Sequence, residues 1–591
     1  MRYSYYMINF LKKVTPFQIL LVLFFAFCLI SGLSFSRNII ISMMENLIGR
    51  KLNDMTKWNA VISGSMAFFA FSALITYFFI YIDYGKKAFS EMKAKIIKLV
   101  TSPDFFKILL TSTVIVTIAY LSLLRSNYDF ADDTKRIISG HKSWVGASRY
   151  VSEILSVFLH TNFYLNDISP LSQLVSIVIL VFAALVLCYS FNSEGFSIPA
   201  LAACLLFTVS PYYFENLSYK FDSPYMALAM LFGILPFLFR KEKKAYICSS
   251  IVCLLLALTS YQAANSIYII LTIFSCLLMF LQEEDKKEIL YFTLTSVFCY
   301  IFALIIFRLF IMIPTEATIS ERNTNVATLG MLSLFKSNLV MYSRVVICRF
   351  GNLWIKGFAL ILAIAFPFSG ASYCKSSKFK GAILSIISLA LMFFLSFGAY
   401  LVIGNTVITD RAFMGFDILI SVIALFDVIS FASGKRKILT RIAIYALFYG
   451  FVIQAIVTGN LYAKQMKYEE FRYAILLNDL SEILDFNKTS RLLLDGEIGN
   501  AVKTHMEYKN YPIMPLGALS GGWAKYYLEN WNFEADFLQI EASSERIERN
   551  EEFKSLKESL PVIKDTYYHT IKGKDNTYYV YFKNPRVKDY E

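Results

Sequence analysis

Blocks of about twenty apolar residues recur along the 591-residue chain, and a membrane-crossing helix needs about that length. Composition agrees, because 57% of the residues are hydrophobic and only 17% are charged, against about 25% charged in a soluble domain. The sequence therefore predicts an all-α polytopic membrane protein and excludes a cytosolic enzyme or a nucleic-acid factor, so no nucleic acid is expected as a partner. We predict about thirteen transmembrane helices, near 16–33, 60–82, 105–124, 168–190, 196–214, 222–239, 245–260, 264–281, 289–311, 353–370, 381–403, 414–432 and 439–459.

Lysine and arginine collect in four of the short connections, and in such loops positive charge marks the cytoplasmic side. With thirteen crossings the four clusters fall on the same side as the amino terminus. They lie within 86–98, 240–244, 375–380 and 435–437. The other polar segments are then expected to face outward, and these are 34–58, 125–166, 215–221, 261–263, 312–352, 404–413 and everything after 460.

The last segment, 460–591, has a different charge from the rest. It holds 18 Lys and Arg against 21 Asp and Glu, a net charge of −3, whereas the whole chain carries +13. A helical pattern (Tyr468 to Phe486) precedes two strand-like runs (Arg491 to Asp495 and Thr577 to Phe582). We predict a small α/β domain on the outward side. The chain is accordingly divided into N-terminal membrane helices with a basic cytoplasmic loop (1–104), a membrane core (105–459) and the outward domain (460–591).

The first long outward loop carries an acidic cluster. If 129–136 forms a helical turn, Asp129, Asp132 or Asp133, and Arg136 share one face. Two adjacent carboxylates at a membrane surface can supply a general base and a neighbour that raises its pKa. Ordinary solvated carboxylates are the alternative interpretation. The loop continues with Gly140, Trp144, Gly146 and Arg149.

A second outward turn places four polar side chains between two hydrophobic helices: Glu215, Asn216, Lys220 and Asp222. Helix capping by Asp222, with tyrosines in the interfacial aromatic belt, explains part of this pattern. Capping does not require two carboxylates, a lysine and an amide, so a polar cleft at the membrane interface is the better interpretation.

Further polar residues interrupt or border later spans. Tyr261-Gln262 breaks an apolar run, and Asp410-Arg411 immediately precedes another. The alternative interpretation of Arg411 is that its side chain only extends its charge to the membrane interface. An ionisable residue within a span, such as Asp417, is a functional or pairing candidate. Asp427 lies toward the cytoplasmic end and is interpreted as structural. No histidine or cysteine pattern has the spacing of a metal site, and we expect no metal.

Together these residues resemble the motifs of the Gtr-type serotype-converting O-antigen glucosyltransferases. The resemblance covers about residues 105–430 and is most specific in Glu-Asn-Leu-Ser-Tyr-Lys-Phe-Asp-Ser at 215–223. The Asp-Asp pair with its following Arg, Gly, Trp and Arg is similar to the family's first loop. Tyr261-Gln262 resembles a third motif, and Asp410-Arg411 resembles the arginine motif before a late span. The first two spans and the segment after 460 carry no matching motif.

The resemblance implies an inverting glycosyltransferase of the GT-C type, in a bacterial inner membrane, with its active site and carboxyl terminus in the periplasm. It would move a hexose, glucose in the named family, from a polyprenyl-phosphate donor to lipid-linked O-antigen repeat units. Its partners would be these two substrates, membrane lipids and, functionally, a donor synthase and a flippase. No cofactor is expected, since a polyprenyl-phosphate donor requires no nucleotide pocket.

The resemblance also implies roles for individual residues. Asp132 or Asp133 would be the general base, and Asp132 is favoured because it would share a helical face with Asp129 and Arg136. The candidates for binding the donor phosphate are Arg411, Lys220 and Arg149. The candidates for binding sugar and acceptor are Arg136, Glu215, Asn216, Asp222, Tyr261 and Gln262.

Three alternatives remain, a transporter, another kind of enzyme and a binding protein. A lipid-linked sugar flippase or other transporter should show internal repeats and broken helices at the membrane midplane, whereas the polar residues here collect at one surface. An O-antigen polymerase or ligase would depend on arginines rather than on paired aspartates. A membrane-anchored binding protein would carry its function in the segment after 460.

Overall fold

The computed structural model describes residues 76, 78–192, 195–312, 331–403, 408–431, 434–485, 489–505, 521–538 and 546–585. The predicted span 16–33 and most of 60–82 lie outside the described residues. Eight described helices are long and apolar enough to cross a membrane, so the protein is a polytopic helical membrane protein. They are α6 (Phe105–Ser126), α9 (Leu171–Phe191), α13 (Lys243–Ser260), α14 (Asn265–Leu281), α15 (Lys286–Ile306), α18 (Leu353–Tyr373), α19 (Lys378–Leu395) and α21 (Gly434–Ile483).

Three further predicted spans are shorter or end in tighter turns. They correspond to α10 (Ile198–Leu205) with η2 (Leu206–Val209), α12 (Ser223–Ile234) with η3 (Leu235–Phe239), and α20 (Met414–Ser430). Two segments expected to connect spans are themselves helical, α5 (Asp83–Val100) and α17 (Met331–Arg349). Hydropathy therefore located the apolar segments but not the polar helices between them.

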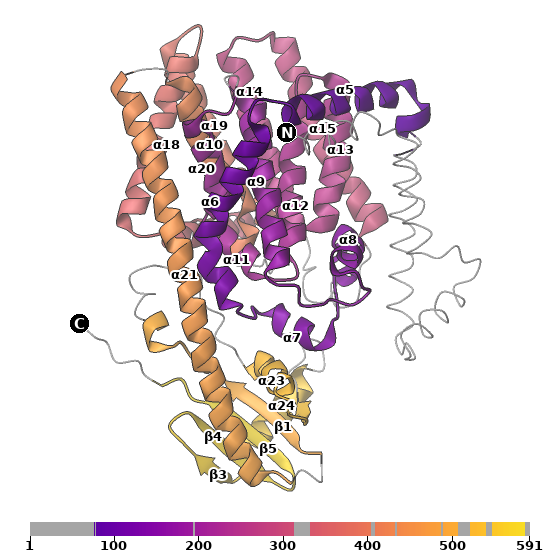
Figure 1. The fold of residues 1–591 in the computed structure, drawn as a ribbon, viewed down its shortest axis with the longest axis vertical. Helices are drawn as coiled ribbons and strands as arrows, with labels where there is room; N and C mark the ends of the chain where they lie inside the picture. The colour runs from indigo at the N-terminus through magenta and orange to yellow at the C-terminus, as the bar shows by residue number, and fades with distance from the viewer. Residues whose placement is uncertain are drawn as a thin grey trace.

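Helix α21 is 50 residues long and runs from the membrane bundle into the carboxyl-terminal part (Figure 1). At 1.5 Å per residue it extends about 75 Å, far more than the about 30 Å of a hydrocarbon core. The division expected at residue 460 therefore falls inside one continuous helix. Because no loop separates the two parts there, α21 holds the carboxyl-terminal part in a defined position beneath the bundle.

The carboxyl-terminal part contains a five-stranded mixed sheet of order β2-β1-β5-β4-β3. The two strands expected from the sequence are present as β1 and β5, which pair in parallel. The elements are β1 (Arg491–Gly496), α23 (Gly521–Asn530), β2 (Asp536–Leu538), α24 (Arg546–Ser559), β3 (Val562–Asp565), β4 (His569–Lys574) and β5 (Thr577–Phe582).

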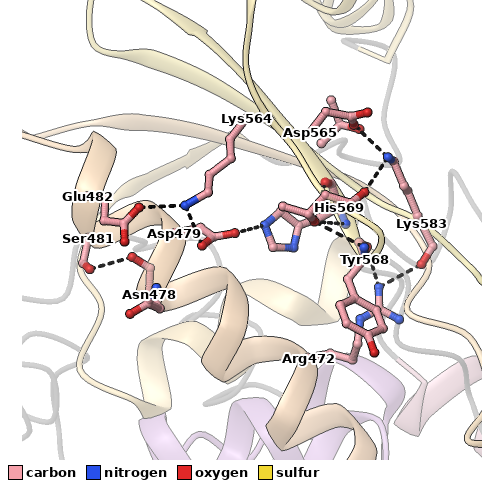
Figure 2. A network of polar contacts seen from close by, with 12 residues as sticks. Arg472, Asn478, Asp479, Ser481, Glu482, Lys564, Asp565, Tyr568, His569 and Lys583 are labelled. Atoms are coloured by element: carbon pink, nitrogen blue, oxygen red, sulfur yellow. Dashed lines mark hydrogen bonds and ion pairs between the residues drawn. The ribbon is translucent and has the colours of Figure 1, made fainter.

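Polar contacts fasten the end of α21 to this sheet (Figure 2). The buried Arg472 guanidinium donates to the backbone carbonyls of Ile498, Tyr568 and Lys583. About two turns further on, Asp479 accepts from His569 and pairs with Lys564 at 2.9 Å each (Figure 2). An arginine that donates to three separate segments fixes those segments to one another.

Candidate active site

The motifs recognised in the sequence meet at the end of the bundle that faces the carboxyl-terminal part (Figure 1), which we call the motif end. The opposite end, which carries the clusters at 86–98, 240–244, 375–380 and 435–437, is called the basic end. The motif end is built by short elements: α7 (Asp132–Ser139), η1 (Val145–Ala147), α8 (Tyr150–His160), α11 (Tyr213–Ser218), η4 (Gln262–Ala264) and η7 (Asp410–Ala412).

The two adjacent aspartates of α7 have unequal surroundings. Asp132 is exposed, whereas Asp133 is fully buried. The expected helical face with Asp129 was wrong, because the helix begins only at Asp132, after Ala131 adopts a positive φ of 48°. Asp129 therefore lies in the preceding loop, and the geometric reason for favouring Asp132 is lost.

Asp133 is held by one hydrogen bond and retains one free oxygen. Its Oδ2 accepts from the backbone N–H of Lys220 at 2.9 Å, while the buried Oδ1 has no partner. Burial raises the pKa of Asp133 to about 7, although the nearby Arg136 charge and the Lys220 hydrogen bond act to lower it. A carboxylate that titrates near neutrality is suited to general-base catalysis.

Lys220 organises this acidic cluster from within the protein. Its side chain is only 2% exposed, and its Nζ pairs with Asp129 and lies 3.9 Å from Asp167. With its backbone bonded to Asp133, Lys220 connects three carboxylates. The expected phosphate cation thus has its charge balanced by the protein itself.

Asp222 is the acceptor of a second buried cluster. It pairs with Arg136 and accepts a 2.6 Å hydrogen bond from the indole of Trp144. The Arg136 guanidinium also lies 5.1 Å from the Trp144 ring centroid. Arg149 approaches the same carboxylate at 3.9 Å. The first and second sequence motifs are joined through Asp222.

The third motif orients Arg149. The Nε of Arg149 donates to Gln262 at 3.2 Å, and the amide of Gln262 donates to the carbonyl of Ala147 at 2.7 Å. The guanidinium lies 4.6 Å from the centroid of the Tyr261 ring, a cation–π arrangement. The Arg149 side chain as a whole is 21% exposed.

The second motif orients Arg411 in a similar way. The backbone N–H of Arg411 donates to Glu215 at 2.9 Å, and its carbonyl accepts from Asn216 at 3.3 Å. Its guanidinium donates to the hydroxyl of Tyr219 and lies 4.8 Å from that ring centroid. The Arg411 side chain is 24% exposed. Glu215 and Asn216 therefore hold the arginine turn rather than lying free in a cleft.

The arginines of the motif end repel one another. Burial lowers the pKa of Arg149, and the positive charges of Arg411 and Arg136 lower it further, against a raising effect of Tyr261. Arg136 is already paired with Asp222. The guanidiniums of Arg149 and Arg411, on partly exposed side chains, can bind an anion through charge-assisted hydrogen bonds.

The sequence did not indicate two further polar residues of this region. Arg349, at the end of α17, pairs with Asp410 at 2.6 Å. Burial raises the pKa of Asp410 to about 7, against the lowering effect of Arg349. Glu469 of α21 is buried beside the loop that precedes α7. Its only sequence signal was its position four residues after Gln465, which places the two polar side chains on one helix face.

Within the described residues, no group of three or more His, Cys, Asp and Glu side chains is placed to hold a metal ion.

A membrane-embedded bundle with carboxylates and arginines gathered at one end defines a class of protein that handles polar substrates at the membrane surface. The family model for the glucosyl transferase GtrII matches residues 121–428, more than half of the chain, and the chain belongs to this family. Every candidate site residue from Asp129 to Arg411 lies inside the matched segment.

One curated relative is an uncharacterized 55.3 kDa protein encoded in the gtrB 5' region of Salmonella phage P22. It is 29% identical over 119 residues, which are 20% of this chain and 24% of the phage protein. The match thus spans about a quarter of that relative's length. No solved structure matches the chain.

Proposed function

We propose that the protein transfers a hexose, glucose by its family, from a polyprenyl-phosphate donor to O-antigen repeat units carried on lipid. The observation that supports this most is the placement of Arg149 and Arg411, whose side chains are 21% and 24% exposed, at the same end of the bundle as Asp133. The link to Asp133 is Arg136, three residues further along α7, which pairs with the Asp222 carboxylate that Arg149 also approaches. An anionic leaving group and a proton acceptor are the two requirements of this reaction.

In the proposed reaction the acceptor hydroxyl gives its proton to a carboxylate as its oxygen bonds to the anomeric carbon of the donor. The bond from that carbon to the phosphate oxygen breaks, and polyprenyl phosphate leaves with the electron pair. Arg149 and Arg411 stabilise the leaving phosphate, and a single displacement of this kind inverts the anomeric carbon. Glu215, Asn216, Tyr261 and Gln262 act indirectly, by orienting these two arginines.

We assign the general base to Asp133 rather than to Asp132. The support is its unpaired Oδ1 and its pKa near 7. Asp132 is exposed and would contact the acceptor at the entrance. Arg136 and Asp222 hold one buried cluster together, and Lys220 holds the cluster that contains Asp133; both would lie beneath the substrates.

We place the reaction on the periplasmic side of the inner membrane. The support is that the lysine and arginine clusters of short loops lie at the basic end, and such clusters are typical of the cytoplasmic side. A donor made in the cytoplasm would then require a synthase and a flippase as functional partners.

The test is transfer by the purified full-length protein in liposomes, with undecaprenyl-phosphate glucose as donor and lipid-linked O-antigen repeat units as acceptor. Donor consumption together with a new glycosidic linkage, identified by NMR, is the expected result. Asp83→Asn, an exposed carboxylate at the basic end, is a matched control for active-site variants. Movement of the donor lipid between leaflets without a new linkage would instead identify a transporter.

A further inference from the structure

Glu469 is a buried carboxylate at the junction of three parts of the molecule. It lies on α21, beyond the apolar part of that helix, and has no exposed surface. Its Oε1 accepts from the hydroxyl of Tyr128 at 3.1 Å and from the amide of Gln465 at 2.9 Å. Its Oε2 accepts from Tyr128 at 3.2 Å and from Tyr527 of α23 at 3.5 Å. Isolated buried carboxylates are costly, so a site with several donors aimed at one is a specific arrangement.

Gln465 extends this junction into the carboxyl-terminal part. Its amide also donates to the carbonyl of Gly499 at 3.1 Å, and its oxygen accepts from the backbone of Ala501 at 2.9 Å. Helix α23 in turn packs against α7 (Figure 1). At this contact the Nζ of Lys135 lies 5.9 Å from the Tyr526 ring centroid. The carboxyl-terminal part therefore contacts the helix that carries Asp132 and Asp133.

A continuous chain of contacts leads from Glu469 to Asp133. Tyr128 is bonded to Glu469, and the next residue, Asp129, pairs with the Nζ of Lys220. The backbone N–H of the same lysine holds the Oδ2 of Asp133. Each step is a hydrogen bond, an ion pair or a peptide bond, and Tyr128, Lys220 and Asp133 are buried, whereas the side chain of Asp129 is 27% exposed.

We propose that Glu469 is a positioning residue for the transfer reaction, through which α21 and the carboxyl-terminal part fix the 127–131 loop and hence the carboxylate of Asp133. The proposal rests on the proposed function for its effect on catalysis. It assigns to the carboxyl-terminal part a role in the geometry of the active site itself, besides any contact with substrate. Small displacements of a catalytic group can reduce a rate by about 100-fold.

Glu469→Gln tests the proposal, because it replaces one of the two acceptor oxygens with an NH2 group. That group cannot accept the hydrogen bonds that Tyr128, Gln465 and Tyr527 donate to Glu469. We expect kcat to fall by about ten- to a hundredfold, with the KM for undecaprenyl-phosphate glucose nearly unchanged. Glu470→Gln, the exposed neighbour on the same helix, is the matched control and should behave as wild type. An unchanged kcat in Glu469→Gln would overturn the proposal.

A double-mutant cycle with Tyr128→Phe separates positioning from general loss of stability. If Glu469 acts through Tyr128, the double variant should be no slower than the slower single variant, since residues in one network are not additive. If the fold loss of kcat in the double variant equals the product of the losses in the two single variants, the proposal is overturned. Hydrogen exchange of residues 127–136 gives a readout that does not need activity, and it should accelerate in Glu469→Gln and not in Glu470→Gln. If the wild-type protein transfers no hexose, the proposed function fails, while this exchange measurement still decides the structural part.

Discussion

The two ends of the helical bundle use charged residues in opposite ways. At the basic end, the paired side chains keep contact with water: those of Lys243–Glu288 are 54% and 49% accessible, and those of Lys95–Glu242 are 24% and 29% accessible. At the motif end, Arg136–Asp222 is only 7% and 6% accessible. Removing charges from water is expensive, and a buried pair often adds no net stability. The buried network is therefore better explained by the site it arranges, whereas the exposed charges suffice to orient the chain in the membrane.

The largest difference between the two ends should come from Asp133→Asn. The amide keeps the shape and one acceptor oxygen but cannot take a proton, and general-base catalysis contributes about 10²–10⁴-fold. We expect a loss of transfer of about that size in single-turnover assays, and none for Asp83→Asn at the basic end. Asp132→Asn should slow transfer less, because Asp132 is exposed and carries no comparable contacts. The opposite ranking of the two aspartate variants would exchange their roles.

The arginines allow a matched comparison of the ends. Arg411 and Arg436 each lie 4.8 Å from an aromatic ring centroid, Tyr219 at the motif end and Phe368 at the basic end. Lysine keeps the charge but cannot form the two parallel hydrogen bonds of a guanidinium with phosphate. Since a hydrogen bond to a charged group contributes about 1.5–3 kcal/mol, Arg411→Lys should lower kcat by about 10- to 100-fold. Arg436→Lys should leave it unchanged, and equal losses in both variants would remove the distinction between the ends.

The pH dependence sharpens the same comparison. Burial raises the pKa of Asp133 to about 7, and the base must be ionised, so kcat/KM should rise with pH and level off above about 7. The same shift has a stability consequence with the opposite sign. At pH values between 3.8, the usual pKa of the group, and about 7, Asp133 is protonated in the folded state and ionised in the unfolded state. Asp133 therefore contributes stability at low pH that is lost as pH rises through about 7.

Asp133→Asn should remove both effects. Its residual kcat/KM should not rise with pH below about 7. Its thermal midpoint should increase relative to that of the wild type as the pH is raised toward 7. Asp83→Asn should retain the wild-type profile. An acid limb that survives in Asp133→Asn would assign it to another group, and Asp410, whose pKa is also raised to about 7, would be examined next.

The sequence predicted which residues gather at the motif end but not how they pair. Apolar length locates the spans, and the motifs lie at span ends, so residues such as Tyr261 and Arg411 could be expected on one side. Pairing is decided by tertiary packing. Lys220 was expected to bind phosphate, yet it is enclosed by carboxylates from segments 91 and 53 positions away. Hydropathy contains no information about such contacts.

The residues that the sequence failed to indicate have distant partners. Arg349 meets Asp410 across 61 positions, and Glu469 meets Tyr128 across 341. Glu469 also lies beyond the division that was expected at residue 460, on the part of α21 that continues without a break out of the membrane bundle. A charged residue in a polar segment gives no sign of burial, so only the packing of α21 against the 127–131 loop reveals it.

The smallest expected effect belongs to the exposed pair at the basic end. Lys243→Gln removes the positive charge that pairs with Glu288. Both side chains are about half accessible, so water and salt already weaken this attraction. We therefore expect no measurable change in transfer rate or thermal midpoint in physiological salt. Reporter fusions after residue 243 should still place this segment in the cytoplasm, because positive charge in this connection is also supplied by Arg240, Lys241 and Lys244. A loss of transfer in Lys243→Gln comparable to that of Arg411→Lys, at equal protein level, would mean that the two ends are coupled and that the basic end does more than orient the chain.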